Sequence, residues 1–169
     1  MAVLWVALSY NIPSDESKNR VYVWRKLRDM GAESFRPGVA ILPQSEENLR
    51  RFRQLLRRIE GMGGSGALVE LRFLEEGTER EMVSQFDRQA QGGYSRAIAH
   101  GLELFQKDGP TTDRRELQRI ERELRRARQN DYFGSGLTGE LRRGLDLLLR
   151  TAGESLHDFG DTLRDILDD

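Results

Sequence analysis

The chain has 169 residues, of which 37% are hydrophobic and 33% are charged, and its formal net charge is −1. This length suits one domain, or a domain with a helical addition, and allows a single hydrophobic core to be buried. No cysteine is present, which excludes disulfide bonds, zinc–thiolate sites and thiol nucleophiles. The apolar run 2–8 has no basic flank and is too short to cross a bilayer, so we expect a cytoplasmic protein without a membrane partner.

The first 43 residues predict a strand, a helix and a hairpin. Residues 3–10 are apolar at almost every position, which is typical of a strand covered on both faces. A helix is predicted from a cap at Ser14 or Asp15 to Met30, with Gly31 ending it. Two short strands, 33–36 and 39–42, flank Pro37-Gly38, and Pro followed by Gly suits the centre of a type II turn.

A second helix and a last strand complete this region. Ser45 is the expected N-cap of a helix that runs to residue 60. The glycines at 61, 63, 64 and 66 do not form a phosphate-binding loop, because no Gly-Lys-Ser/Thr follows and the segment enters a strand. That strand is predicted over 67–74, with Val69, Leu71 and Phe73 buried by alternation.

The predicted order is therefore β-α-β-β-α-β. It indicates an α+β fold class, with a ferredoxin-like βαββαβ unit over residues 1–75 and a helical C-terminal region over residues 76–169. This plan serves many unrelated functions and does not decide among them.

The helical region predicts four helices. Thr78 and Glu81 resemble a capping box for a long helix that kinks at Gly92-Gly93 and breaks at Gly109-Pro110. The next helix, 113–130, carries a narrow apolar seam and is predicted to form an antiparallel hairpin with the helix at 138–150. An acidic helix is expected over about 153–167. The seam of the 113–130 helix consists of Leu117, Ile120, Leu124 and Ala127.

Catalytic and metal-binding motifs are absent from the sequence. His100 and His157 lie far apart and form no ligand pair, and no histidine accompanies a serine or aspartate in a recognisable catalytic pattern. Most acidic residues stand opposite basic ones at helical spacing, which is typical of a solvated face. We therefore expect no enzyme activity and no cofactor.

Charge is distributed unevenly. The 113–128 segment holds seven arginines, the 45–60 helix holds five, and the tail after Gly153 is acidic. Arginine clusters suit phosphate because the guanidinium binds it with two parallel hydrogen bonds. The alternative is that the acidic tail packs across the basic helices and neutralises them. We favour this alternative for the 113–128 helix, because its seam already serves folding.

The first helix is the stronger candidate for binding. Its inward stripe is predicted to be Val21, Trp24 and Leu27, and Arg20 is expected to lean toward that stripe. Basic residues surround Tyr22 and Trp24, an arrangement that fits an oxyanion or a phosphate backbone. Alternatively, Arg20 stacks on a ring or pairs with a carboxylate. The candidate binding residues are Lys18, Arg20, Arg25, Lys26 and Arg28.

Several segments resemble the N-terminal domain of the ChrB family of chromate-resistance regulatory proteins. The most specific stretch includes Trp5, Arg20-Val-Tyr-Val-Trp-Arg-Lys-Leu27 and Gly38-Val39, and later matches include Glu70-Leu-Arg-Phe and Asp131-Tyr-Phe-Gly. The resemblance implies a regulator that binds promoter DNA and responds to chromate. Family members commonly carry a second, C-terminal domain, so we expect either a stand-alone relative or part of a longer protein.

The predicted βαββαβ region also resembles small CRISPR-associated nucleases, which use an aspartate at the end of the first strand to hold a metal. Here that region reads Ser9-Tyr10-Asn11, and the asparagine is a poorer, uncharged ligand. We therefore predict a ChrB-like, DNA-associated transcriptional regulator. The alternatives are a non-catalytic dimerisation module in an oxyanion-stress pathway and, more distantly, a degenerate nuclease. A homodimer is expected, paired through the free edge of the last strand.

Overall fold

The structure is a computed structural model that describes residues 2–13, 17–108, 113–153 and 157–168. Its chain contacts define two compact units, Met1–Gln85 and Phe86–Asp169. The predicted caps at Ser14 and Asp15 and the predicted break at Gly109-Pro110 lie outside the described residues.

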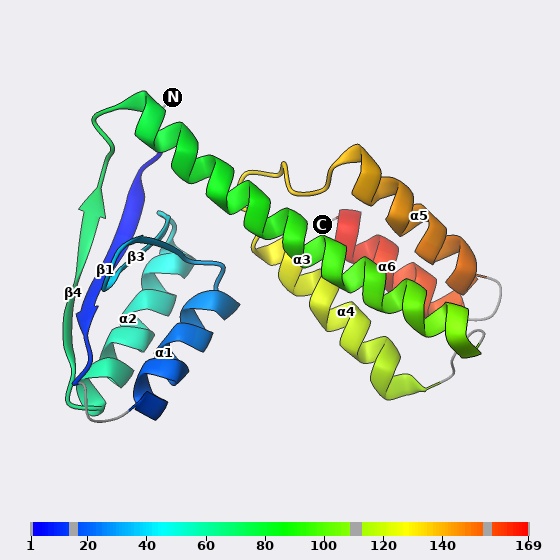
Figure 1. The fold of residues 1–169 in the computed structure, drawn as a ribbon, viewed down its shortest axis with the longest axis horizontal. Helices are drawn as coiled ribbons and strands as arrows, with labels where there is room; N and C mark the ends of the chain where they lie inside the picture. Colours follow the sequence, from blue (N-terminus) through cyan, green and yellow to red (C-terminus); the bar gives the residue numbers. More distant parts are fainter. Residues whose placement is uncertain (1, 14–16, 109–112, 154–156, 169) are drawn as a thin grey trace. The chain divides into compact units, whose positions relative to one another are not determined.

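The first unit contains a four-stranded antiparallel sheet and two helices that lie on the same side of it (Figure 1). The strand order is β2-β3-β1-β4, so β4 and β2 form the edges. The fold is mixed α+β, as predicted. Its elements are β1 (Trp5–Asn11), α1 (Ser17–Asp29), β2 (Glu33–Arg36), β3 (Val39–Pro43), α2 (Glu46–Gly61) and β4 (Ser65–Leu71).

The local signals of this unit correspond closely to the structure. Ser45 caps α2, and its side chain accepts a hydrogen bond from the Asn48 amide. Gly31 and Gly38 have φ values of +69° and +74°, as the predicted helix end and type II turn require. At Gly66 an added Cβ would lie 2.5 Å from the Ser9 carbonyl oxygen, so glycine allows β1 and β4 to approach closely.

The buried stripe of α1 differs from the prediction. Val23 and Leu27 are buried, whereas Val21 is 44% exposed and Trp24 is 55% exposed. Arg20 is also exposed and does not lean into the core. Steps of three or four residues fit several helix faces, and only the neighbouring sheet and α2 decide which face is covered.

The last strand also differs from the prediction. It begins at Ser65 rather than 67, ends at Leu71, and none of its residues is buried. Val69 pairs with Ala7 and lies on the sheet face opposite to that of Leu68. The Val69 side chain is 48% exposed there. Phe73 follows the strand and packs edge-on against Trp5, with ring centroids 5.9 Å apart, so the aromatic end of the pattern does reach the core.

The second unit is helical, and α3 extends across the boundary between the units. Its elements are α3 (Glu76–Asp108), α4 (Arg114–Gln129), α5 (Gly139–Gly153) and α6 (His157–Asp168). Because α3 starts at Glu76, Thr78 lies inside the helix and does not cap it. The helix passes through Gly92-Gly93 without interruption, and Gly93 instead permits close packing, since an added Cβ would lie 3.2 Å from the Ala127 Cβ.

The predicted seam of α4 is buried in the core of this unit. Its packing differs from the predicted hairpin, because α6 contacts both α4 and α5, while α3 meets α4 at Gly93 and α5 at Gly101. The seam correctly predicted that α4 is packed, whereas the predicted partner, the helix at 138–150, differs from the α6 contact that the structure shows. Within the described parts of the chain, none of the helices combines the length and apolarity that crossing a bilayer requires.

Candidate nucleic-acid interface

The candidate interface is the exposed surface of α1 and α2 in the first unit. In α1, five basic side chains stand against one acidic side chain, and in α2 five stand against three. The two helices contact each other, and α2 packs on β1 and β4. Both basic helices therefore lie on one side of the unit, α2 against the sheet and α1 against α2 (Figure 1).

Helical spacing divides the residues of α1 into two ridges. Lys18, Tyr22 and Lys26 follow one another at intervals of four residues, and so do Arg20, Trp24 and Arg28. Arg25 lies two positions after the buried Val23 and is exposed. The structure therefore leaves all five predicted residues on accessible parts of the helix, but it places them on different ridges.

Tyr22 joins the first ridge to α2. The Lys26 ammonium lies 5.6 Å from the centre of the Tyr22 ring, and the Arg58 guanidinium lies 5.7 Å from it. Both distances are within the range of a cation–π interaction. One aromatic ring thus holds together cations from two helices.

Trp24 organises the second ridge. The guanidinium of Arg28 lies 5.2 Å from the Trp24 ring centre, and the indole remains 55% exposed. An exposed indole beside a cation offers both a stacking surface and a phosphate contact.

The sequence did not single out Arg58. Its contact with Tyr22 links positions 36 residues apart, and no local pattern encodes such a contact. The available signal was composition, since Arg57 and Arg58 close a helix that holds five arginines.

The part of the chain that the structure describes contains no candidate metal-binding site. No group of three or more His, Cys, Asp or Glu side chains there is arranged to hold a metal ion. Asn11, the position at which the nuclease resemblance requires an aspartate, is exposed at the end of β1.

The protein therefore has a mixed α+β fold, and basic and aromatic side chains share the exposed surface of α1 and α2. Residues 20–108 match the family described as Protein ChrB, N-terminal, and this segment makes up just over half of the 169 residues. The chain therefore belongs to the ChrB N-terminal family, as its sequence resemblance predicted. No curated protein and no solved structure matches the chain. The matched segment contains α1 from Arg20 onward and all of α2, and so includes most of the candidate interface.

Proposed function

We propose that this protein is a non-catalytic, DNA-associated regulator of the ChrB type, linked to chromate resistance, and that the surface of α1 and α2 contacts the DNA backbone. The observation that supports this proposal is the placement of Lys26 and Arg58 on opposite helices around Tyr22. Membership of the ChrB N-terminal family agrees with it.

Electrostatics supports a polyanionic partner. Neighbouring cations from two helices match the closely spaced phosphates of a duplex, and their binding releases condensed counterions. Arginine adds paired hydrogen bonds to phosphate oxygens. Cation–π contacts restrict these long side chains and so reduce the entropy lost when they bind.

The topology adds two parts to the proposal. The element order β1-α1-β2-β3-α2-β4, with β1 and β3 at the centre of the sheet, supports assignment to the ferredoxin-like group.

The exposed edge strand β4 supports a homodimer formed by edge pairing. Light scattering tests the dimer, and the monomer mass of 19.5 kDa at high protein concentration would refute it.

A salt-titrated binding assay tests the DNA-binding proposal. Fluorescence anisotropy with a labelled duplex should give an affinity that falls steeply with salt. A variant with Arg25, Lys26 and Arg28 changed to Gln should bind more weakly, and the slope of log affinity against log salt should flatten by about 0.9 for each phosphate that is no longer neutralised. Parallel titrations with chromate and with sulfate test a specific response to chromate.

A matched control lies on α4. Changing Arg119, Arg122 and Arg126 to Gln removes the same charge from a helix outside the proposed surface, and should have a smaller effect. Circular dichroism checks that both variants are folded. Loss of binding in the α4 variant alone would refute the proposed surface, and no binding by the unmodified protein at low salt would refute the DNA function.

One observation favours a second function. Val21 and Trp24 are exposed apolar side chains on α1, at 44% and 55%, and such residues also serve protein interfaces. We infer a non-catalytic interaction module as the alternative. It predicts that Trp24→Ala disrupts a protein complex, whereas the charge-removing changes on α1 leave that complex intact.

A further inference from the structure

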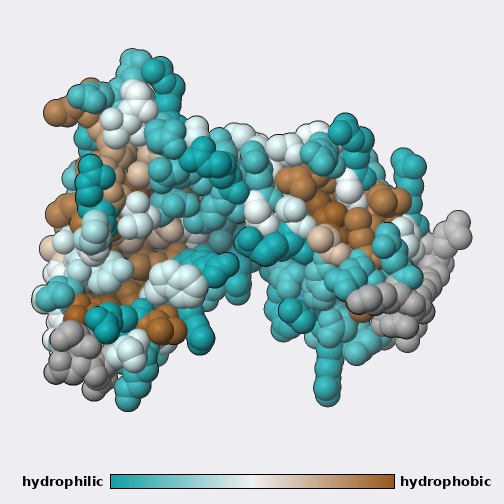
Figure 2. All heavy atoms as spheres, viewed as in Figure 1, coloured by the Kyte–Doolittle hydropathy of each residue, from teal (hydrophilic) through white to brown (hydrophobic). Residues whose placement is uncertain are grey.

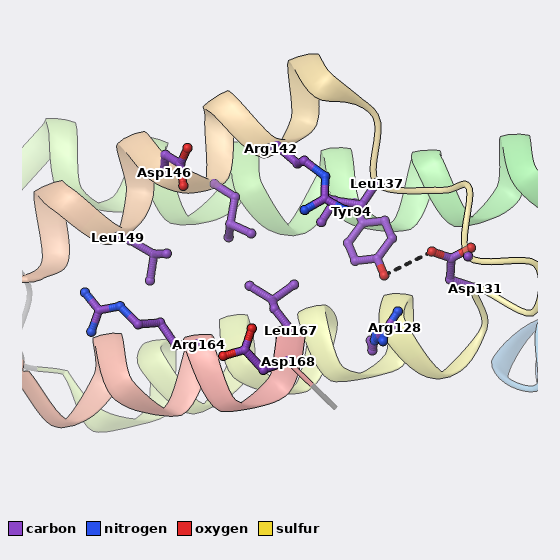
Figure 3. A pocket seen from close by; sticks show the side chains of 12 residues that line it. Tyr94, Arg128, Asp131, Leu137, Arg142, Asp146, Leu149, Arg164, Leu167 and Asp168 are labelled. Carbon is purple, nitrogen blue, oxygen red and sulfur yellow. Dashed lines mark hydrogen bonds between the residues drawn. The ribbon is translucent and has the colours of Figure 1, made fainter.

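The second unit contains a cavity that the proposed DNA-binding surface does not use. It has a volume of about 460 Å³ and lies between α5 and α6, with Tyr94 of α3 and Arg128 of α4 at one end. Small-molecule sites are concave and combine apolar side chains with a few placed polar groups, and this cavity combines four leucines with three arginines and three aspartates. Figure 2 shows the other side of this unit, where α3 lies in front (Figure 1) and a group of apolar side chains is surrounded by hydrophilic ones; the cavity opens on the side seen in Figure 3.

The middle of the cavity is apolar. Leu145, Leu149 and Leu167 line it, and Figure 3 shows Leu149 and Leu167 extending into the space from α5 and α6. The cavity is open to solvent, so water contacts the partly exposed Leu149 and Leu167, and covering this apolar surface is favourable. A hydrocarbon chain or ring would cover it.

One end of the cavity is cationic. Arg142 projects from α5 toward this end, and Arg128 lies on the side of the Tyr94 hydroxyl (Figure 3). Within the described residues Arg142 takes part in no ion pair, although its guanidinium has five N–H donors. Arg142 therefore has donors available for an anionic group, whereas Arg128 also interacts with the Tyr94 hydroxyl and adds a second positive charge at this end.

One carboxylate, Asp131, also lies at this end, where two neutral donors hold it in place. Asp131 accepts a hydrogen bond from the Tyr94 hydroxyl at 3.3 Å and another from the Gly136 amide at 3.1 Å. Its carboxylate thus holds the 131–136 turn against α3, and Tyr94 itself is only 1% exposed.

The opposite end is less favourable to an anion. Arg164 there is paired with Asp161 at 2.8 Å, and Asp146 and Asp168 lie nearby (Figure 3). The two ends of the cavity therefore differ in charge: Arg128 and Arg142 make one end cationic, and the middle is apolar.

We propose that this cavity binds an amphipathic organic anion, with its acidic group at Arg128 and Arg142 and its apolar part along the leucines. A bare oxyanion such as chromate or sulfate would satisfy the arginines but leave the leucines in contact with water. This site belongs to the second unit, and it does not depend on DNA binding by α1 and α2.

Calorimetric titration of the full chain tests the proposal. The probes are decanoate below its micelle concentration, decanol and sulfate. Decanoate should bind at least tenfold more tightly than the other two, because only it has both an anionic group and an apolar chain. Arg142→Gln should weaken decanoate binding by about tenfold, in line with the loss of a charged hydrogen bond.

Arg143→Gln is the matched control: both arginines are exposed on α5, and the change removes the same charge from a position that does not line the cavity. It should change affinity by less than twofold. Equal binding of decanoate by the Arg142→Gln variant would overturn the proposal by indicating adsorption to apolar surface. Equal binding of sulfate would overturn it in favour of a bare oxyanion site, and no binding of decanoate would also overturn it.

Discussion

The two units use arginine in different ways. In the first unit, Arg28 and Arg58 lie over aromatic rings on an open helical surface. In the second unit, Arg128 and Arg142 line a cavity with leucines. An open row of cations suits an extended polyanion, whereas a cavity with two arginines suits one anionic group. The same residue type thus stands in two differently shaped surroundings, and the two proposed ligands differ for that reason.

The two tyrosines show the same contrast. Tyr22 is partly exposed and contacts cations through its ring. Tyr94 is buried and interacts through its hydroxyl, which donates to Asp131. Burial, followed by the negative charge of Asp131, raises the pKa of Tyr94 to about 12. Tyr22 thus contributes its ring to surface contacts in the first unit, whereas Tyr94 contributes its hydroxyl to a structural hydrogen bond in the second.

The largest expected effect distinguishes the two tryptophans of the first unit. Trp5 is 0% exposed, contacts Phe73 edge-on, and donates from Nε1 to Glu79. Trp5→Ala should lower the free energy of unfolding by about 3–5 kcal/mol because it leaves a cavity. Urea unfolding followed by circular dichroism measures this destabilisation.

Trp24→Ala is the control in the same background. Its exposed indole predicts a change within about 0.5 kcal/mol. Comparable destabilisation of the two variants would contradict the burial difference described for this unit.

The next effect concerns alkaline pH. Since the pKa of Tyr94 is about 12 in the folded protein against 10.0 ordinarily, the folded state favours the neutral phenol. This stabilisation is complete below pH 10 and is lost as the pH rises through 12. The decrease amounts to about 2–3 kcal/mol. Unfolding free energies measured from pH 8 to pH 12 should show it.

Tyr94→Phe should remove this part of the pH dependence. The variant should also be less stable at neutral pH by about 1 kcal/mol, because the hydrogen bond to Asp131 is absent. Burial also raises the pKa of Tyr10, so a residual dependence from the first unit should remain. An unchanged alkaline slope in Tyr94→Phe would argue against a buried Tyr94.

A smaller effect compares adjacent glycines of α3. Gly92→Ala meets only the end of the Arg96 side chain, at 3.4 Å, and should stabilise the helix by about 0.8–1 kcal/mol. Gly93→Ala places its Cβ 3.2 Å from the Ala127 Cβ, so crowding against α4 should cancel most of that gain. Thermal unfolding of the pair measures the difference, and equal stabilisation would contradict the close approach of α3 and α4.

The smallest effect concerns Tyr22 and depends on the proposed DNA binding. Tyr22→Leu removes the ring beneath Lys26 and Arg58, and should weaken binding about two- to fivefold, corresponding to about 0.5–1 kcal/mol. Tyr22→Phe keeps the ring and should bind as the unmodified protein does. Anisotropy titrations of both variants decide whether the ring or the hydroxyl matters.

The sequence by itself determined the features that depend on neighbouring residues. Ser45 predicts its helix cap because its side chain reaches the Asn48 amide three positions on. Gly38 predicts the turn because a glycine accepts positive φ at little cost. The apolar seam from Leu117 to Ala127 predicts a packed helix. The order of strands and helices over residues 5–71 follows from such signals.

Only the tertiary structure decided which faces are covered and which distant residues meet. Trp24 and Val69 fit a buried pattern by spacing, yet both are exposed, because nothing in the described part of the first unit covers those positions. Arg58 reaches Tyr22, and Asp131 reaches Tyr94, across 36 and 37 positions of sequence. The cavity beside Arg142 likewise requires α3, α4, α5 and α6 together. Interactions between residues close in sequence determine the helices, strands and turns, whereas the contacts between these elements depend on the packing of the whole unit.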